Sequence, residues 1–211
     1  MHLQLNQHMK IDPAHTSQKD VYKILTGSVI PRPIGWVSTI SEDGVLNLAP
    51  FSFFNAVGED PPHVMFSTVR SGNTNKDTLN NVLATKQFVV NMATEELVEA
   101  MNASSINLPP DGNEFEYAGL TPAPSELVKP PRVKESPISF ECELVHHYSL
   151  EGHKDGGATI MIGRIVMFHV DESVLLDDYK INMETYRPVA RLAGYNYSKL
   201  GEIFSIKRPF I

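Results

Sequence analysis

The chain has 211 residues, a length that suits one domain with a sizeable hydrophobic core. Its formal net charge of -7 argues against general nucleic-acid binding, because such binding depends on lysine and arginine side chains that neutralise phosphates. Its single cysteine, Cys142, excludes an intrachain disulfide and a cysteine-based zinc cluster, and it favours a reducing compartment. The N-terminus lacks the apolar segment of a signal peptide, and no run is long and apolar enough to cross a bilayer, so we expect a cytoplasmic protein without a membrane segment.

The stretch PIGWVSTISEDGVLNLAPFSFF, residues 33–54, predicts a β-hairpin. Asp43 and Gly44 provide a tight turn, and Pro50 predicts a bulge or an unpaired edge because proline cannot donate to a strand ladder. Both faces of this hairpin are mostly apolar, so we expect its outer face to be covered by a helix or by a second subunit. The small polar side chains within it then need partners from the backbone, from water or from a ligand.

Alternating and helical patterns follow in turn. The pattern predicts a strand over residues 63–69, a helix over 75–86 with Asn and Thr as capping candidates, and a strand over 87–92. A second helix is expected within 94–104, with Thr94 as its N-cap.

Residues 106–137 are rich in proline and polar residues and predict a long surface excursion with one helical turn near residues 113–117. Two long β-rich segments, 138–150 and 157–175, predict a second hairpin, and an aromatic and basic tail follows. This order predicts a mainly β protein with helices, an antiparallel β-barrel with short covering helices rather than a βαβ sheet. We expect an N-terminal extension over residues 1–20 and one domain over 21–211.

The sequence lacks the common catalytic motifs. It contains no G-x-S-x-G, P-loop or G-x-G-x-x-G motif at a strand-to-helix turn, and Cys142 lies within a predicted strand without a base nearby in the sequence. His146 and His147 are adjacent, so in a strand they face opposite sides, and with His153 they are expected on a half-exposed strand rather than around a metal ion. We expect no metal site.

An anion site is one of two interpretations of residues 67–78. Ser67 ends a predicted strand, a loop with Arg70 follows, and a helix begins near Lys76 and Thr78, so that hydroxyls, cations and free helix amides come together. The other interpretation is that polar residues only cap the helix and that Lys76 is solvated; the carboxylate of Asp77 at the same helix end favours this second interpretation.

The hairpin could bind a ring to which such an anion is attached. Flat apolar surface and edge hydrogen bonds together suit a flat heteroaromatic ring joined to a phosphate. Taken one at a time, the aromatic residues fit a simple core better. The aromatic residues are Trp36, Phe51, Phe53 and Phe54, and the polar ones are Ser38, Thr39, Ser52 and Asn55.

At these residues the sequence resembles the flavin reductase-like family, the FMN-binding split-barrel proteins that include flavoredoxin and the reductase components of two-component flavin monooxygenases. The resemblance is carried by an ordered set of segments that spans most of the chain outside the first twenty residues and the excursion. These segments are RPIGWVSTISEDGVLNLAPFSFFNAV, DPPHVMFSTVRSGNTNKDTLNNVLATKQFVVN, ECELVHHYSLEGH, IMIGRIVMFHVDESVL and RPVARLAGYNYSKLGEIFSIKRP.

The resemblance implies a split β-barrel that carries FMN, as a homodimer with sites at or near the subunit interface, and it favours the anion interpretation of the helix start. The residues implied along the flavin are Trp36, Val37, Ser38 and Thr39. Those implied to border the ring and the ribityl chain are Ala49, Pro50, Phe51, Ser52 and Phe53. Those implied to hold the phosphate are Ser67, Lys76 and Thr78, with Arg70 beside them.

By the same resemblance, the protein is an NADH- or NADPH-dependent flavin reductase that passes hydride to FMN, with a partner oxygenase or another electron acceptor. Many family members carry a Gly-Asp-His segment beside the nicotinamide; here Gly152 and His153 lack the Asp, which puts nicotinamide use in doubt more than FMN binding. His153 would at most steer the nicotinamide, or it is a loop histidine with no such role. The alternatives are a non-enzymatic FMN electron carrier or flavin storage protein, and a pyridoxamine-phosphate-oxidase-like or haem-binding split barrel, which the absorbance spectrum distinguishes.

Overall fold

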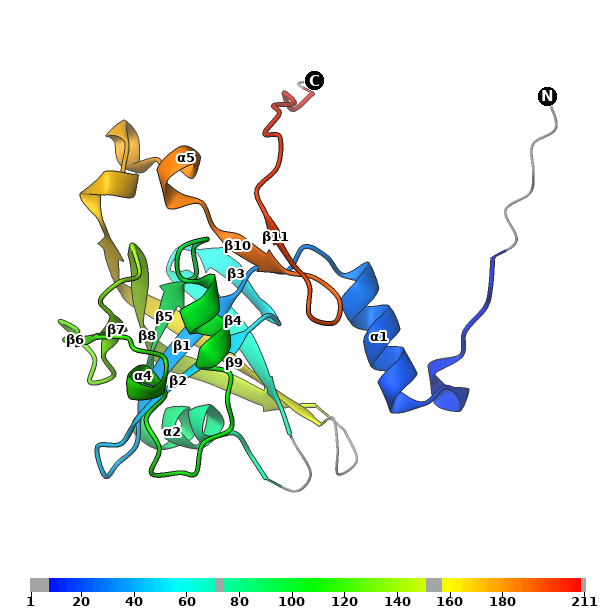
Figure 1. The fold of residues 1–211 in the computed structure, drawn as a ribbon, viewed down its shortest axis with the longest axis horizontal. Coiled ribbons are helices and arrows are strands. Elements are labelled where there is room, and N and C mark those ends of the chain that lie inside the picture. Colours follow the sequence, from blue (N-terminus) through cyan, green and yellow to red (C-terminus); the bar gives the residue numbers. More distant parts are fainter. Residues whose placement is uncertain (1–7, 71–73, 151–156, 210–211) are drawn as a thin grey trace.

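A computed structural model describes residues 8–70, 74–150 and 157–209 (Figure 1). Its main element is a seven-stranded antiparallel sheet in the order β2-β1-β5-β8-β9-β4-β3. β2 and β3 follow each other in the chain but lie at the two opposite edges, so the sheet does not close, and the expected mainly β split barrel is confirmed. The strands are β1 (Gly35–Ile40), β2 (Leu46–Phe51), β3 (Phe54–Glu59), β4 (Pro62–Val69), β5 (Gln87–Met92), β8 (Ile138–Ser149) and β9 (Ala158–Val170).

Short helices and two small ribbons surround this sheet. Among the described residues, no helix is long and apolar enough to cross a membrane. The α-helices are α1 (Gln18–Ser28), α2 (Asp77–Thr85), α3 (Val98–Ala103), α4 (Glu114–Tyr117) and α5 (Met183–Tyr186). The 3-10 turns are η1 (Pro13–His15), η2 (Glu172–Val174) and η3 (Asp177–Tyr179), and the two-stranded ribbons pair β6 (Pro122–Ala123) with β7 (Arg132–Val133) and β10 (Val189–Arg191) with β11 (Tyr197–Lys199).

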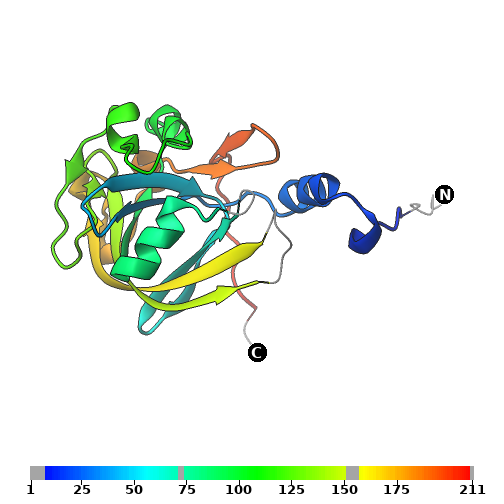
Figure 2. The same ribbon diagram turned by 90° about the horizontal axis from the view of Figure 1, so that it is seen from below.

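The first core lies between α2 and one face of the sheet (Figure 2). Leu79 and Val82, one helical turn apart on α2, pack into a cluster with Val37 of β1, Phe88 of β5 and Phe66 of β4. The apolar residues whose helical spacing predicted α2 therefore form the helix face that packs into the barrel.

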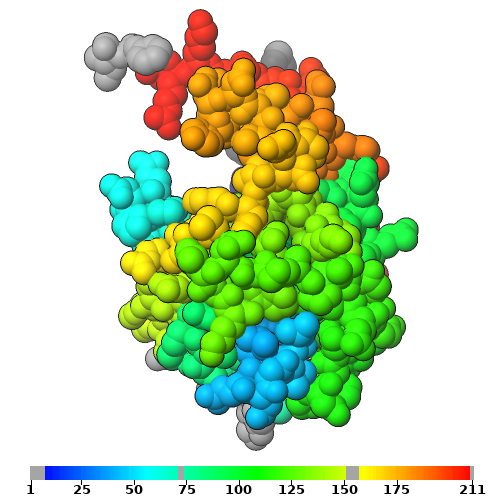
Figure 3. Space-filling view, turned by 90° about the vertical axis from the view of Figure 1, so that its left-hand side faces the viewer, coloured from blue at the N-terminus to red at the C-terminus, as the bar shows by residue number. Residues whose placement is uncertain are grey.

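A second core lies on the other face of β1 and β2. Trp36 packs there with Met101 of α3 and Phe115 of α4. Figure 3 shows the excursion, in green, beside the tip of the β1–β2 hairpin, in blue. Because Trp36 and Val37 point into different cores, β1 is buried on both sides, as its doubly apolar pattern predicted, and the covering elements belong to the same chain.

The hairpin, α2, β5 and the turn α4 form where the sequence predicted them, whereas other predictions need correction. β3 is a separate strand that the sequence did not indicate. α3 begins at Val98 instead of near Thr94, which bridges Pro188 in an isolated strand pair. The N-cap of α2 is Lys76, not an Asn or Thr, and no side chain caps this helix start.

Both terminal segments leave the body of the molecule (Figures 1 and 2). α1 projects to one side, and residues 200–209 form no helix or strand. Large apolar side chains on these segments are exposed. They include Tyr22, Leu25 and Val29 near the N-terminus, and Ile203, Phe204 and Ile206 near the C-terminus.

Candidate functional site

The polar residues of β1 face the protein interior. Trp36, Val37, Ser38 and Thr39 each have no exposed surface, and none lines a cavity described below. The expected position of these four residues along the flavin stays a prediction, but their side chains do not reach these cavities. The covering of β1 on both faces, by α2 and by α3 with α4, is the physical reason.

Ser38 belongs to a buried network that joins three parts of the chain. Its hydroxyl donates to the carbonyl oxygen of Pro131 and accepts from Nδ2 of Asn91 at 3.2 Å. Oδ1 of Asn91 in turn accepts from the backbone N–H of Val133 and from the hydroxyl of Ser139, both at 2.9 Å. The network fixes the excursion against β1 and β5, so Ser38 has a structural partner.

Thr39 belongs to a second network, which reaches the start of α2. Nδ2 of Asn47 donates to Oγ1 of Thr39 at 3.1 Å and to Oγ1 of Thr78 at 2.9 Å, and Asn81 also donates to Thr39 at 3.1 Å. Thr78 is almost fully buried, and it is one of the residues that line a cavity at the start of α2. The network therefore fixes the first turn of α2 relative to the hairpin.

The segment that leaves β2 and enters β3 borders three adjoining cavities. We name them the helix cavity (about 120 Å³), the strand cavity (about 400 Å³) and the arginine cavity (about 310 Å³). Pro50 borders the helix and arginine cavities, and Ser52 borders the arginine and strand cavities. The structure thus brings together most of the residues implied for the cofactor on β2 and beyond: Ala49, Pro50, Phe51, Lys76 and Thr78 at the helix cavity, and Ser52, Phe53 and Ser67 at the strand cavity.

The helix cavity lies at the start of α2. Lys76 is half-buried, and its Nζ donates to Oδ1 of Asn107 at 2.7 Å. Two acids share this cavity, Asp77 of the first helical turn and the buried Glu114, whose Oε2 accepts from the backbone N–H of Leu48 at 3.1 Å. Burial raises the pKa of the Glu114 carboxyl, and the charge of Asp77 adds to this rise. The cavity therefore combines one cation with a carboxyl that burial pushes towards its neutral form.

The strand cavity offers hydroxyls and flat apolar surface. Ser52 Oγ accepts from Nε of Arg32 at 3.2 Å, and the backbone N–H of Ser67 donates to the carbonyl oxygen of Phe53 at 2.9 Å. The ring of Phe66, which lines this cavity, lies 5.1 Å from the ring of Phe51, which lines the helix cavity. A flat ring with polar edges fits such a lining.

Other predicted residues lie elsewhere. Arg70 is exposed, lines none of the three cavities, and donates its backbone N–H to the carbonyl oxygen of Gly157. His153 lies outside the described residues, and His146 and His147 are exposed on β8. Within the described ranges, no group of three or more His, Cys, Asp or Glu side chains could hold a metal ion. Cys142 is buried, and burial raises the pKa of its thiol, so it stays protonated.

The sequence alone did not single out Arg32 and Arg191, although both line the arginine cavity. Arg32 sits between two prolines just before an apolar strand, and because arginines are mostly exposed, its burial had no signal in the sequence. Arg191 lies in the tail, 159 positions away by their numbers, so no local pattern joins the two.

Comparison with known proteins gives one family and close structural neighbours. The family described as "Flavin reductase like domain" matches residues 26–187. The structure of nitrilotriacetate monooxygenase component B from Bacillus cereus superposes with a TM-score of 0.91 at 42% identity, covering 95% of this chain and 100% of that one. The structure of 2-nitrobenzoate 2-nitroreductase NbaA from Pseudomonas fluorescens has a TM-score of 0.83 at 30% identity, covering 95% of this chain and 96% of that one. The structure of flavoredoxin from Desulfovibrio vulgaris has a TM-score of 0.71 at 26% identity, covering 84% of this chain and 91% of that one.

Proposed function

Because this chain belongs to the flavin reductase like family, we propose that it binds FMN in the helix and strand cavities and transfers hydride to it from NADH or NADPH. One observation carries the proposal: eight residues expected at the cofactor from the family resemblance border two of three adjoining cavities at the gap between the sheet edges. The donor set there, with hydroxyls, a lysine and flat apolar side chains, fits a phosphorylated flavin.

Each cavity has a separate task in this proposal. Lys76 and the first amides of α2 would hold the phosphate, since a helix start with a cation beside it favours an anion. The hydroxyls of Ser52 and Ser67 would direct the ribityl chain and the ring edge, and Phe53 would exclude water from one side. When bound, FMN supplies the redox chemistry, accepting hydride from the nicotinamide and passing electrons to an acceptor. The chain itself binds and orients, so we expect no acid–base residue.

The absorbance spectrum of the purified protein tests the cofactor. A flavin spectrum, with FMN identified by mass in the extract, supports the proposal, whereas a haem spectrum or a protein that takes up no added FMN overturns it. Oxidation of NADH and NADPH, followed with and without added free flavin, then tests the activity.

A second candidate is an electron carrier that holds FMN without using a nicotinamide. Two observations favour it: the Gly152–His153 segment lacks an Asp, and the structural neighbours include a flavoredoxin. A protein that binds FMN, oxidises neither nicotinamide, and is reduced by another electron donor would support the carrier over the reductase.

We also propose that the protein is a homodimer that delivers electrons to a partner oxygenase or to another acceptor. The similarity to a monooxygenase component B supports an oxygenase as acceptor. Exposed apolar side chains on the two terminal segments, including Leu25, Val29, Phe204 and Ile206, support a second copy as the partner that covers them.

A further inference from the structure

The arginine cavity carries positive charge with no acidic residue among the described side chains that line it. Arg32 and Arg191 both border it, in a chain whose formal net charge is -7. Another cavity, which shares Asp77 and Glu114 with the helix cavity, shows the opposite arrangement. Among the described residues, it is bordered by no basic residue and by four acidic residues: Asp43, Asp77, Asp111 and Glu114. The pairing of two cations in the arginine cavity is therefore a local feature that the composition does not explain.

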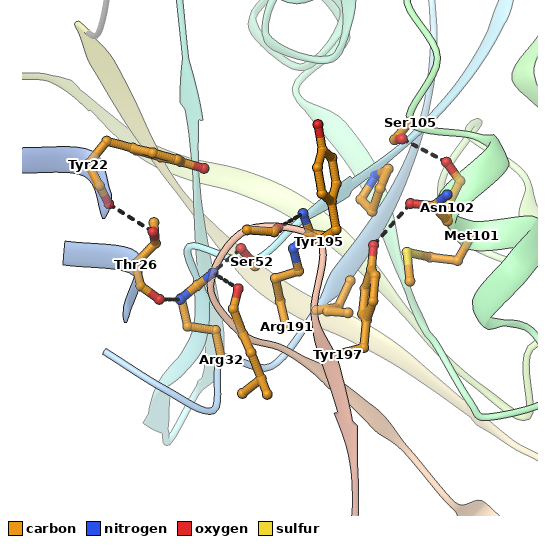
Figure 4. A pocket seen from close by; sticks show the side chains of 14 residues that line it. Tyr22, Thr26, Arg32, Ser52, Met101, Asn102, Ser105, Arg191, Tyr195 and Tyr197 are labelled. Carbon is orange, nitrogen blue, oxygen red and sulfur yellow. Dashed lines mark hydrogen bonds between the residues drawn. The ribbon is translucent and has the colours of Figure 1, made fainter. Parts of the chain in front are cut away.

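Arg32 is only 5% exposed, yet its guanidinium contacts neutral oxygens. It donates to Oγ of Ser52 and to the carbonyl oxygens of Thr26, Val29 and Leu192, at 2.6 to 3.2 Å. Figure 4 shows the bonds to Ser52 and Thr26. In the part of the chain that the structure describes, it makes no ion pair with a carboxylate. Buried charges normally have a charged partner, because desolvation without one is costly. A guanidinium has five N–H donors, so these four bonds leave one for a ligand.

Arg191 is held beside it by the backbone. The backbone N–H of Arg32 donates to the carbonyl oxygen of Arg191 at 3.0 Å. The backbone N–H of Arg191 donates in turn to the carbonyl oxygen of Arg32 at 2.9 Å. The Arg191 guanidinium lies 4.5 Å from the ring centre of Tyr197 and donates to the carbonyl oxygen of Gly194, and it too makes no ion pair among the described residues. Two like charges fixed side by side repel, and a bound anion between them would offset this cost.

The walls of the cavity select the shape of such an anion. Tyr22 of α1 and Tyr197 of β11 line the cavity beside the two arginines, and the largely exposed Tyr195 lies at its rim (Figure 4). The apolar Ile34 and Pro50 complete this lining. Aromatic walls favour a flat aromatic group. A volume of about 310 Å³ lies at the small end of ligand pockets and is too small for a dinucleotide.

We propose that the arginine cavity binds a small aromatic carboxylate, with the carboxylate on the two arginines and the ring against the tyrosines. Planar guanidinium groups suit carboxylates: Arg191, with one side-chain N–H on Gly194, can form paired hydrogen bonds, and Arg32 can add its one remaining N–H. Pro50 and Ser52 border this cavity and also the two cavities proposed for FMN, so the ring would lie next to the flavin as its second substrate; this last step rests on the proposed function.

Titration calorimetry with benzoate and with benzamide tests the site on the full-length protein. The two probes share a ring, but only benzoate carries the charge. We expect benzoate to bind at least tenfold more tightly than benzamide and more tightly than inorganic phosphate. Equal affinities for benzoate and benzamide would overturn the charge recognition, and phosphate binding as tight as benzoate binding would overturn the role of the ring. This comparison needs no variant.

Arg191→Met should weaken benzoate binding about tenfold or more and leave benzamide and FMN binding unchanged. The matched control is Arg164→Met on β9, which removes the same charge from an exposed pair with Glu143 and should change nothing. An Arg191→Met protein that binds benzoate like the wild type overturns the proposal. Binding of benzoate by a protein that does not bind FMN would refute the proposed function alone, and FMN binding without charge-dependent benzoate binding would refute this inference alone.

Discussion

Nε1 of Trp36 donates a hydrogen bond of 2.9 Å to Oγ of Ser104, at the end of α3. The same hydroxyl donates to the carbonyl oxygen of Met101 at 2.8 Å, and Ser104 borders the helix cavity. The chain's one tryptophan is thus fully buried but linked through a single hydroxyl to the wall of the candidate site.

Ser104→Ala should lower the free energy of unfolding by about 1 to 2 kcal/mol, because it leaves the buried indole N–H without its acceptor. Chemical denaturation measures the loss. Ser105→Ala is the matched control: its hydroxyl also donates to a carbonyl oxygen, that of Asn102, but it is exposed, so we expect a change below about 0.5 kcal/mol. Similar losses in both variants would contradict a role for the indole bond.

Lys76→Gln should weaken FMN binding about tenfold, since a charge-assisted hydrogen bond contributes about 1.5 to 3 kcal/mol. Riboflavin has the same ring without the phosphate, so its affinity should stay the same. Lys86→Gln, at the opposite end of α2, removes the same charge and should affect neither ligand. If Lys76→Gln weakened riboflavin as much as FMN, the phosphate would have to lie elsewhere.

Glu141 is expected to make stability depend on acid pH. It has no exposed surface, and its carboxylate accepts from the backbone N–H groups of residues 126, 127 and 128 and from Nε2 of His169. Burial alone would raise its pKa, but these donors together lower it below the usual 4.5. A carboxyl with a lowered pKa in the folded state stabilises the fold above its unfolded pKa, and this contribution is lost as the pH falls through the lowered value.

Glu141→Gln should therefore lower the free energy of unfolding by about 3 kcal/mol at neutral pH. It should also make that free energy fall less steeply as the pH drops below 4.5. Denaturation curves at several pH values measure both effects. Glu143→Gln, two residues along the same strand in an exposed pair with Arg164, should cost less than about 1 kcal/mol and keep the wild-type pH dependence. An unchanged pH dependence in Glu141→Gln would rule out this carboxylate as the source.

The purified protein should scatter light as a dimer, at twice the chain mass of 23.5 kDa. Replacing both Phe204 and Ile206 by Ser should shift it towards a monomer, because these side chains are 76% and 83% exposed in the single chain and need a cover. Tyr179→Ser removes an equally exposed aromatic residue, 92% exposed, outside the terminal segments and should leave the mass unchanged. A wild-type monomer at micromolar concentration would exclude the dimer.

The local patterns predicted the β1–β2 hairpin and α2 well, because turn residues and helical spacing act over a few positions. They could not tell what the polar residues of β1 contact. Ser38 meets Pro131 and Asn91, which are 93 and 53 positions away, and nothing near Ser38 in the sequence distinguishes such partners from a ligand. The same holds for Arg32, whose neighbour Arg191 comes from the tail. The segments around the site were predictable, whereas the pairing of their side chains depends on the whole fold.

The gap between β2 and β3 has a consequence for exchange dynamics. These strands share no hydrogen bonds and lie at opposite edges of the sheet, but residues 52 and 53 connect them directly and border the cavities. A molecule bound there would contact both edges at once and would oppose any separation of them. Deuterium uptake at the amides of β2 and β3 should therefore slow together when FMN is added, whereas we expect the two strands to exchange independently in its absence.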